Sequence, residues 1–257
     1  MSTEITEHFA DVNGVNLAYL AAGPEDGPVV TLVHGFASNA HVNWQETGWI
    51  RYLARASYRV IAPDNRGHGR SDKFYRRDDY SIETMARDVV GLWDVLNIGR
   101  SYVVGYSMGA RISLRLASLF PHRALSLSIG GNGDGIIRDR SGWQDIANAL
   151  LAGSDDDPVV SGQGQVFRTF AQRTGSDLPA LAACVLGALQ PFTAEMIRAI
   201  DTDVLIAVGT KDDVAGDPQA LADLMLRAKV LHLEGKNHMS AVGDRDWKNE
   251  TLAHFGS

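Results

Sequence analysis

The chain has 257 residues, of which 45% are hydrophobic and 21% are charged, with a formal net charge of −7 at pH 7 and a sequence pI near 5.6. This length fits one globular α/β domain with an insertion. The acidic balance argues against a nucleic-acid partner, which normally requires a basic patch. The first residues carry acids where a secretion signal needs positive charge and an apolar run, so we expect a cytoplasmic protein.

The most apolar stretch covers residues 180–189 and contains the one cysteine, Cys184. It is shorter than the roughly 20 residues that cross a bilayer, so we expect a packed helix and no membrane partner. A single cysteine excludes an intrachain disulfide and a thiolate metal cage. Because no His or Lys adjoins Cys184 in the sequence to lower its pKa, we expect a buried, inert thiol.

Strand-like and helix-like segments alternate along most of the chain. Asn13-Gly14 is a turn dipeptide between two β-like runs, which predicts a hairpin over residues 8–22. The β-branched run at 28–33 predicts a strand covered on both faces. The other predicted elements are a helix from Trp49, a strand at 58–62, a helix from Ser81 to Gly99, a strand from Ser101, a helix over 108–120, and strands at 124–129, 203–208 and 229–233, with helices around 218–227 and 247–255. This order predicts parallel strands joined by right-handed crossovers.

Residues 134–200 interrupt that alternation. Loop signals at 153–158, at 161–164 and at Pro191 separate short helical patterns. We therefore predict a helical cap over 134–200, inserted into a core formed by residues 1–133 and 201–257.

The pentapeptide Gly105-Tyr106-Ser107-Met108-Gly109 ends an apolar run and opens a helix-like segment. It is typical of a nucleophile elbow, a strained turn that exposes a serine hydroxyl. The strain brings the residues two before and two after the serine close together, where only glycine fits. Ser107 is the predicted nucleophile, and the alternative is a serine that only caps a helix.

A serine hydroxyl needs a base to take its proton and an acid to orient that base. His238 follows the last predicted strand and is the predicted base. Asp212 follows the strand at 203–208 and is the favoured acid, with Asp213 beside it as a rival that spacing does not remove. Both loops follow strand carboxyl ends, where open α/β sheets place their ligands.

The backbone N–H groups of Phe36 and Met108 are the predicted oxyanion-hole donors, because each follows a strand that points at the site. We interpret His34 and His68 as structural parts of the neighbouring loops and His41 as a candidate to line the pocket. The remaining histidines, His8, His122, His232 and His254, are expected at the surface.

Together, these motifs resemble the α/β-hydrolase superfamily from about residue 10 to the C-terminus. The motifs that carry the resemblance are His34-Gly35-Phe36, Asp64-x-Arg66-Gly67-His68-Gly69-x-Ser71, the elbow at 105–109, Gly209-x-x-Asp212 and Asn237-His238. The resemblance implies an α/β fold with a mostly parallel eight-stranded sheet, flanking helices and a helical cap. It also implies a Ser107–His238–Asp212 triad and no cofactor or metal.

A carboxylic-ester hydrolase (carboxylesterase) acting through an acyl-enzyme on small or medium apolar esters is the leading functional hypothesis. The apolar cap residues that suggest such a substrate are Trp143, Phe167, Phe170, Phe192 and Met196. A carbon–carbon bond hydrolase or a lactonase with the same triad is the alternative, and a hydrolase-fold small-molecule receptor is a third hypothesis. Haloalkane dehalogenases and epoxide hydrolases are disfavoured because those relatives use Asp where this chain has Ser107. The sequence leaves open whether the protein is a homo-oligomer.

Overall fold

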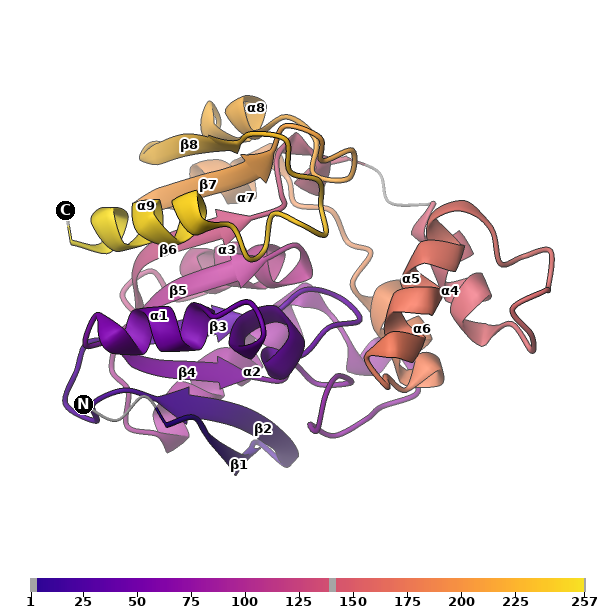
Figure 1. The fold of residues 1–257 in the computed structure, drawn as a ribbon, viewed down its shortest axis with the longest axis horizontal. Helices are drawn as coiled ribbons and strands as arrows, with labels where there is room; N and C mark the ends of the chain where they lie inside the picture. The colour runs from indigo at the N-terminus through magenta and orange to yellow at the C-terminus, as the bar shows by residue number, and fades with distance from the viewer. Residues whose placement is uncertain (1–3, 139–141, 257) are drawn as a thin grey trace.

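The computed structural model describes residues 4–138 and 142–256, and its centre is an eight-stranded sheet. The strands are β1 (Thr6–Val12), β2 (Val15–Ala22), β3 (Val29–Val33), β4 (Arg59–Pro63), β5 (Ser101–Tyr106), β6 (Ala124–Gly130), β7 (Val204–Gly209) and β8 (Ala228–Leu233). Their order across the sheet is β1-β2-β4-β3-β5-β6-β7-β8 (Figure 1). The β1–β2 and β2–β4 pairs are antiparallel and the other pairs are parallel. The predicted mostly parallel sheet and its N-terminal hairpin are confirmed.

Helices cover both faces of the sheet, and others lie beyond the carboxyl ends of its strands. They are α1 (Trp49–Arg55), α2 (Ile82–Val95), α3 (Met108–Leu119), α4 (Trp143–Leu151), α5 (Gly162–Arg173), α6 (Leu178–Gly187), α7 (Ala194–Arg198), α8 (Pro218–Ala222) and α9 (Arg245–Phe255). Alternate strand residues face opposite layers, so that Ile206 packs with the core under α2 and α3 while Leu205 packs with the core under α1 and α9. The inner strands β3, β4, β5, β6 and β7 are therefore buried on both faces, as the apolar runs predict, whereas the edge strands β1 and β8 are partly exposed.

A side-chain cap begins α2, whereas two of the predicted helix ends differ in the structure. The Ser81 hydroxyl accepts the Thr84 N–H at 2.9 Å and caps α2, as predicted. The helix ends at Val95 rather than at Gly99, and Asn97 takes the left-handed backbone with φ of 54°. The predicted helix around 218–227 is shorter than expected and ends at Ala222, because the chain must turn back to pair Ala228 with Val204.

His254 is buried and not at the surface, contrary to the prediction. It lies on the same stripe of α9 as Trp247 and Thr251, both fully buried against the sheet. Its Nε2 lies 2.8 Å from the Ser126 hydroxyl on β6, which satisfies the polar ring atom within the core. His8, His122 and His232 are exposed, as expected.

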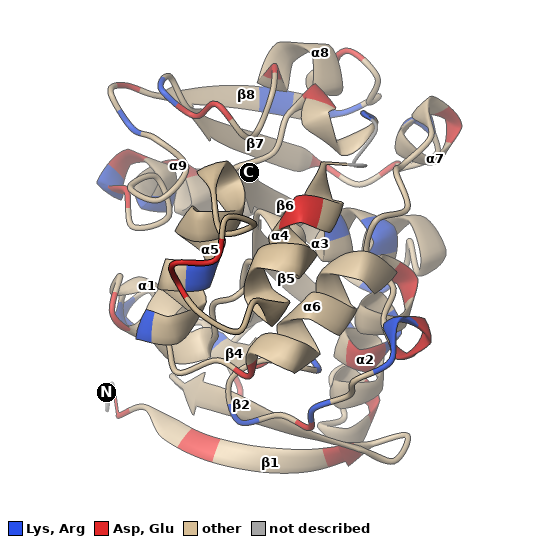
Figure 2. Cartoon of the chain, turned by 90° about the vertical axis from the view of Figure 1, so that its right-hand side faces the viewer, with Lys and Arg blue, Asp and Glu red and all other residues tan. Residues whose placement is uncertain are grey.

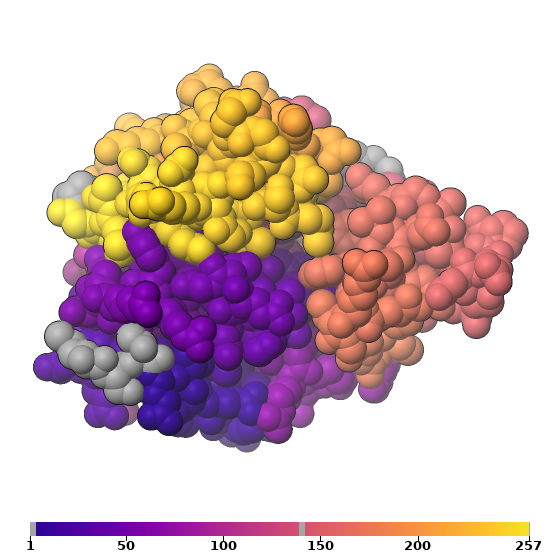
Figure 3. Space-filling model, viewed as in Figure 1, coloured from indigo at the N-terminus to yellow at the C-terminus, as the bar shows by residue number. Residues whose placement is uncertain are grey.

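The helices α4, α5 and α6 pack together beyond the carboxyl ends of the parallel strands, at the right of Figure 1 and of the space-filling view in Figure 3. Figure 2 shows α6 without a charged residue, and Cys184 within it is fully buried. The helix α7 packs against α3 instead. The division of the chain at 134–200 stays a prediction. Of the helices in the described residues, none is long and apolar enough to cross a membrane.

Candidate active site

Ser107 lies at the sharp turn between β5 and α3. Its backbone has φ of 53° and ψ of −112°, a conformation that is strained for a residue with a side chain. A Cβ at Gly105 would lie 2.5 Å from the Gly109 carbonyl oxygen, and a Cβ at Gly109 would lie 1.9 Å from that of Val33. Both positions therefore require glycine, and the turn can press against β3 while exposing the hydroxyl.

Three loops at one edge of the sheet bring Ser107, His238 and Asp212 together. The Ser107 Oγ lies 3.0 Å from His238 Nε2. On the other side of the ring, His238 Nδ1 lies 2.8 Å from Asp212 Oδ2 and 3.1 Å from Oδ1. These side chains follow β5, β8 and β7, so the parallel strands align their carboxyl ends at one place.

Asp212 is held as a buried carboxylate. Its Oδ1 accepts the N–H groups of Val214 and Ala215, each at 3.0 Å. Burial alone raises the pKa of Asp212, but the hydrogen bond and charge interaction with His238 and these two backbone donors outweigh it, so its pKa lies below the ordinary value. Asp213, the rival acid, lines the cavity beside Ser107 instead.

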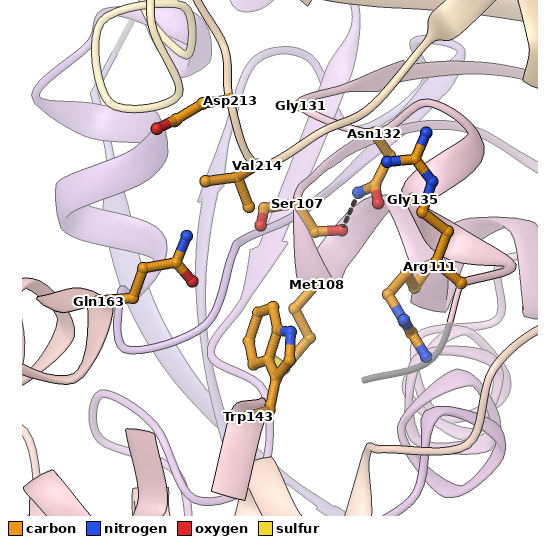
Figure 4. Close-up of a pocket in the computed structure, with 11 residues that line it drawn as sticks. Ser107, Met108, Arg111, Gly131, Asn132, Gly135, Trp143, Gln163, Asp213 and Val214 are labelled. Atoms are coloured by element: carbon orange, nitrogen blue, oxygen red, sulfur yellow. Dashed lines mark hydrogen bonds between the residues drawn. The ribbon is translucent and has the colours of Figure 1, made fainter. Parts of the chain in front are cut away.

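Two further side chains support the nucleophile and the base. The Tyr106 hydroxyl donates to the His238 carbonyl, and the two rings lie 5.5 Å apart. The Asn132 side chain donates to the Ser107 carbonyl at 2.6 Å (Figure 4). Sequence reasoning missed both residues. The available signals were the position of Tyr106 inside the elbow motif and that of Asn132 just after β6, at the same edge of the sheet.

The predicted oxyanion donors lie in the two segments that flank Ser107. Met108 is the first residue of α3, where N–H groups lack a partner within the helix. The loop with Phe36 passes against the elbow, since a Cβ at Gly35 would lie 3.4 Å from the Ser107 Cβ. Asn43 fixes this loop by accepting the Gly35 N–H at 2.8 Å. The arrangement fits two main-chain donors, and their role stays a prediction.

His34 and His68 are fully buried behind the loop that holds Phe36, in the structural positions that the sequence suggested. The Nε2 of His34 accepts the Asn65 N–H at 2.9 Å, which requires a neutral ring. Burial lowers the pKa of His34 to about 4 and that of His68 to about 3.

Lowering the pH should therefore reduce the free energy of unfolding at pH values well above the pKa values of the carboxylates. Above pH 6.5 both rings are neutral in the folded and the unfolded chain. As the pH falls from 6.5 toward about 4, the unfolded chain gains protons that the folded chain cannot bind. Each histidine should then remove about 1.4 kcal/mol of unfolding free energy per pH unit. Urea unfolding between pH 7 and pH 4.5 measures this slope, and an unfolding free energy that stays constant over that range would contradict the assignment.

His41 does not lie at Ser107. Its side chain is 60% exposed and lies 3.2 Å from Glu46. It lines a separate hollow with Tyr19 and Arg70, near the N-terminal hairpin. The prediction that it lines the pocket is therefore wrong, because the loop after β3 turns the imidazole outward.

Two hollows of different character meet at Ser107. A polar cavity of about 210 Å³ is lined by Ser107, Met108, Arg111, Gly131, Asn132, Gly135, Arg138, Trp143, Gln163, Asp213 and Val214 (Figure 4). A smaller, mostly apolar pocket of about 40 Å³ is lined by Ser107 and His238 together with Gly35, Phe36, Ser38, Asn43, Tyr106, Phe167, Phe170, Met239 and Val242. Within the described residues, no group of three or more His, Cys, Asp and Glu side chains could hold a metal ion.

The sheet, the elbow and the Ser107–His238–Asp212 arrangement define one class of protein. Residues 28–178 match the alpha/beta hydrolase fold family, and the chain belongs to that family. It is 40% identical over 113 residues to the AB hydrolase superfamily protein YfhM of Bacillus subtilis, a match that covers 44% of this chain and 38% of that protein. It is 36% identical over 129 residues to epoxide hydrolase B of Mycobacterium tuberculosis, covering 48% of this chain and 35% of that protein. The matched segments thus span well under half the length of these relatives.

Solved structures resemble the whole chain. A hydrolase from Pseudomonas aeruginosa PA01 has a TM-score of 0.81 at 22% identity, with 98% of each chain covered. The 2-hydroxy-6-oxo-6-phenylhexa-2,4-dienoate hydrolase of Rhodococcus sp. strain RHA1 has a TM-score of 0.75 at 19% identity, with both chains fully covered. At these identities the likeness shows the fold.

Proposed function

We propose that this protein is a serine hydrolase that cleaves small or medium-sized carboxylic esters through an acyl-enzyme. The observation that carries the proposal is the continuous contact from the Ser107 hydroxyl through His238 to the buried Asp212 carboxylate. A nucleophile, a base and an orienting acid at these distances are what acyl transfer requires.

In the proposed reaction, the Ser107 Oγ attacks the ester carbonyl carbon while its proton passes to His238 Nε2. The N–H groups of Phe36 and Met108 stabilise the negative oxygen that forms. His238 then gives the proton to the departing alkoxide, so the alcohol leaves and the acyl group stays on Ser107. Water then attacks the acyl carbon by the same steps and releases the acid. Asp212 stabilises the charged imidazole in both halves of the reaction.

The apolar pocket supports a substrate with a modest apolar group. Phe167 and Phe170 from the cap line it, together with Met239 and Val242. Of the other apolar cap residues considered, Trp143 lines the polar cavity. Phe192 packs beside the Arg111 guanidinium, and Met196 packs against the main core. Only part of the predicted apolar set thus faces Ser107, and the pocket of about 40 Å³ favours a short chain.

The fold and triad equally suit a lactonase or a carbon–carbon bond hydrolase. The similar Rhodococcus enzyme acts on a dienoate by its name. Two relatives from Mycobacterium tuberculosis are named epoxide hydrolase A and epoxide hydrolase B, but serine rather than aspartate at position 107 keeps that activity disfavoured.

A p-nitrophenyl ester series from acetate to decanoate, with fluorophosphonate labelling in parallel, tests the proposal. We expect labelling of Ser107 and turnover that is fastest for the shorter chains. Labelling without turnover of any ester would refute the ester assignment and direct the search to lactone and carbon–carbon substrates. Tight ligand binding with neither labelling nor turnover would favour a receptor.

A further inference from the structure

We infer that the substrate carries a carboxylate, which the polar cavity beside Ser107 binds through Arg111. This inference deepens the proposed function, on which it rests, by naming the chemical class of the substrate. The carboxylate would belong to a part of the substrate away from the bond that is cleaved.

The two hollows at Ser107 favour a substrate with one apolar end and one polar end. The apolar pocket offers Phe167, Phe170 and Val242. The polar cavity, which is about five times larger, offers two arginines and the side-chain amides of Asn132 and Gln163. An entirely apolar ester would leave the larger cavity filled with water, whereas a ligand with a polar end would use both.

Arg111 is built into this cavity. It lies on α3, four residues and about one helical turn after Ser107, and only 2% of it is exposed. Its Nη2 donates to the carbonyls of Gln190 at 2.6 Å and Ala188 at 3.3 Å, and its guanidinium carbon lies 5.8 Å from the centre of the Phe192 ring. The two carbonyls and the Phe192 ring help to orient the guanidinium, whose planar fork matches the two oxygens of a carboxylate.

The charges around Ser107 are arranged asymmetrically. Arg138 also lines the cavity, but its side chain is 62% exposed and bridges to Asp134, so solvent weakens its effect. Asp213 lines the same cavity, and Figure 4 shows it on the other side of Ser107 from Arg111. An anionic group is therefore attracted toward Arg111 and repelled from Asp213, which gives the substrate a preferred orientation.

Matched pairs of esters test the inference. On the acyl side, mono-p-nitrophenyl glutarate is compared with p-nitrophenyl pentanoate. On the alcohol side, 4-acetoxybenzoate is compared with phenyl acetate. In at least one pair we expect the anionic member to have the higher kcat/KM, by roughly 10- to 100-fold, as for a hydrogen bond to a charged group. Added salt should reduce this ratio.

Variants locate the preference within the cavity. The preference is the ratio of kcat/KM for the anionic ester to kcat/KM for its neutral partner. Arg111→Gln should bring this anionic-to-neutral ratio most of the way to one, Arg111→Lys should retain part of the preference, and Asp213→Asn should raise the ratio. Arg138→Gln should lower it less, and as a surface change it serves as a second variant if Arg111→Gln fails to fold. Arg115→Gln is the matched control, because Arg115 lies one turn further along α3 and pairs with Glu83, outside the cavity.

A preference for the neutral ester in both pairs would overturn the inference. So would an anionic-to-neutral ratio that is unchanged in both Arg111→Gln and Arg138→Gln. If Ser107 is labelled but no ester is turned over, the proposed ester activity fails while the carboxylate site stays testable. Protection of Ser107 against fluorophosphonate labelling then tests that site. Glutarate, but not neutral glutaramide, should slow fluorophosphonate labelling, and Arg111→Gln should abolish that protection. Equal protection by both compounds, or none by either, would count against a carboxylate site.

Discussion

Replacing Ser107 by alanine should lower kcat by roughly 10³- to 10⁶-fold, the range found when one member of such a catalytic unit is removed. Without the hydroxyl no acyl-enzyme can form, and only binding and the oxyanion donors remain to assist attack by water. The measurement is kcat on the ester that proves best in the p-nitrophenyl series, together with loss of fluorophosphonate labelling.

The fold of this variant should survive, because alanine keeps the Cβ of Ser107 and the lost hydroxyl hydrogen-bonds to His238 within the site. Thermal unfolding and circular dichroism check this point. Ser113→Ala is the control, since that hydroxyl lies on α3 close to the elbow but donates to the Gly109 carbonyl within the core. Retention of turnover and labelling in Ser107→Ala would place the nucleophile elsewhere in the chain.

The features that could be predicted depend on residues close together in sequence. The turn at Asn13-Gly14 and the cap at Ser81 each need only a few neighbours to form, and both occur where predicted. The strand–turn–helix around Ser107 is also largely local, because Gly105 makes room for the turn itself, while Gly109 makes room for the neighbouring β3. Continuous apolar strands then indicated a sheet covered on both sides.

The features that could not be predicted depend on how distant segments pack. Asp212 and Asp213 are adjacent in one loop, and only the path of that loop decides which carboxylate reaches His238. The donation from Asn132 to Ser107 requires the ends of β5 and β6 to lie side by side. His254 could have been placed inside from its shared stripe with Trp247, but its polar ring suggested the surface.

The two arginines of α3 illustrate the same limit. Spacing by four residues puts Arg111 and Arg115 on one side of the helix. In the fold their surroundings differ, since Arg111 is buried under the segment after α6 while Arg115 reaches Glu83 on α2. Only this difference turns one of them into a candidate binding residue.

Replacing Asp212 by asparagine should lower kcat by about 10⁴-fold, the effect of the same change in another serine triad. The amide can present N–H to His238 Nδ1 and so favours the tautomer that cannot take the Ser107 proton at Nε2. It also removes the negative charge that stabilises the imidazolium during attack. Because burial and the Val214 and Ala215 donors hold the Asp212 side chain in place, the loss should appear in kcat rather than in KM.

The adjacent residue provides the comparison. Asp213→Asn makes the same chemical change one residue away, and the loss of kcat on a neutral ester should be at least roughly 100-fold smaller than for Asp212→Asn, since the charge of Asp213 acts only through the cavity. Equal losses would mean that both carboxylates serve the histidine, and a larger loss for Asp213→Asn would reverse the assignment.

The pKa of Asp212, lowered mainly through its contacts with His238 against the opposing effect of burial, gives an independent check. Its pairing contributes stability that is present above the ordinary pKa near 3.8 and lost as the pH falls through the lower folded value. Asp212→Asn should therefore remove a pH-dependent part of the unfolding free energy below pH 4, and urea unfolding of the variant beside the parent chain measures it.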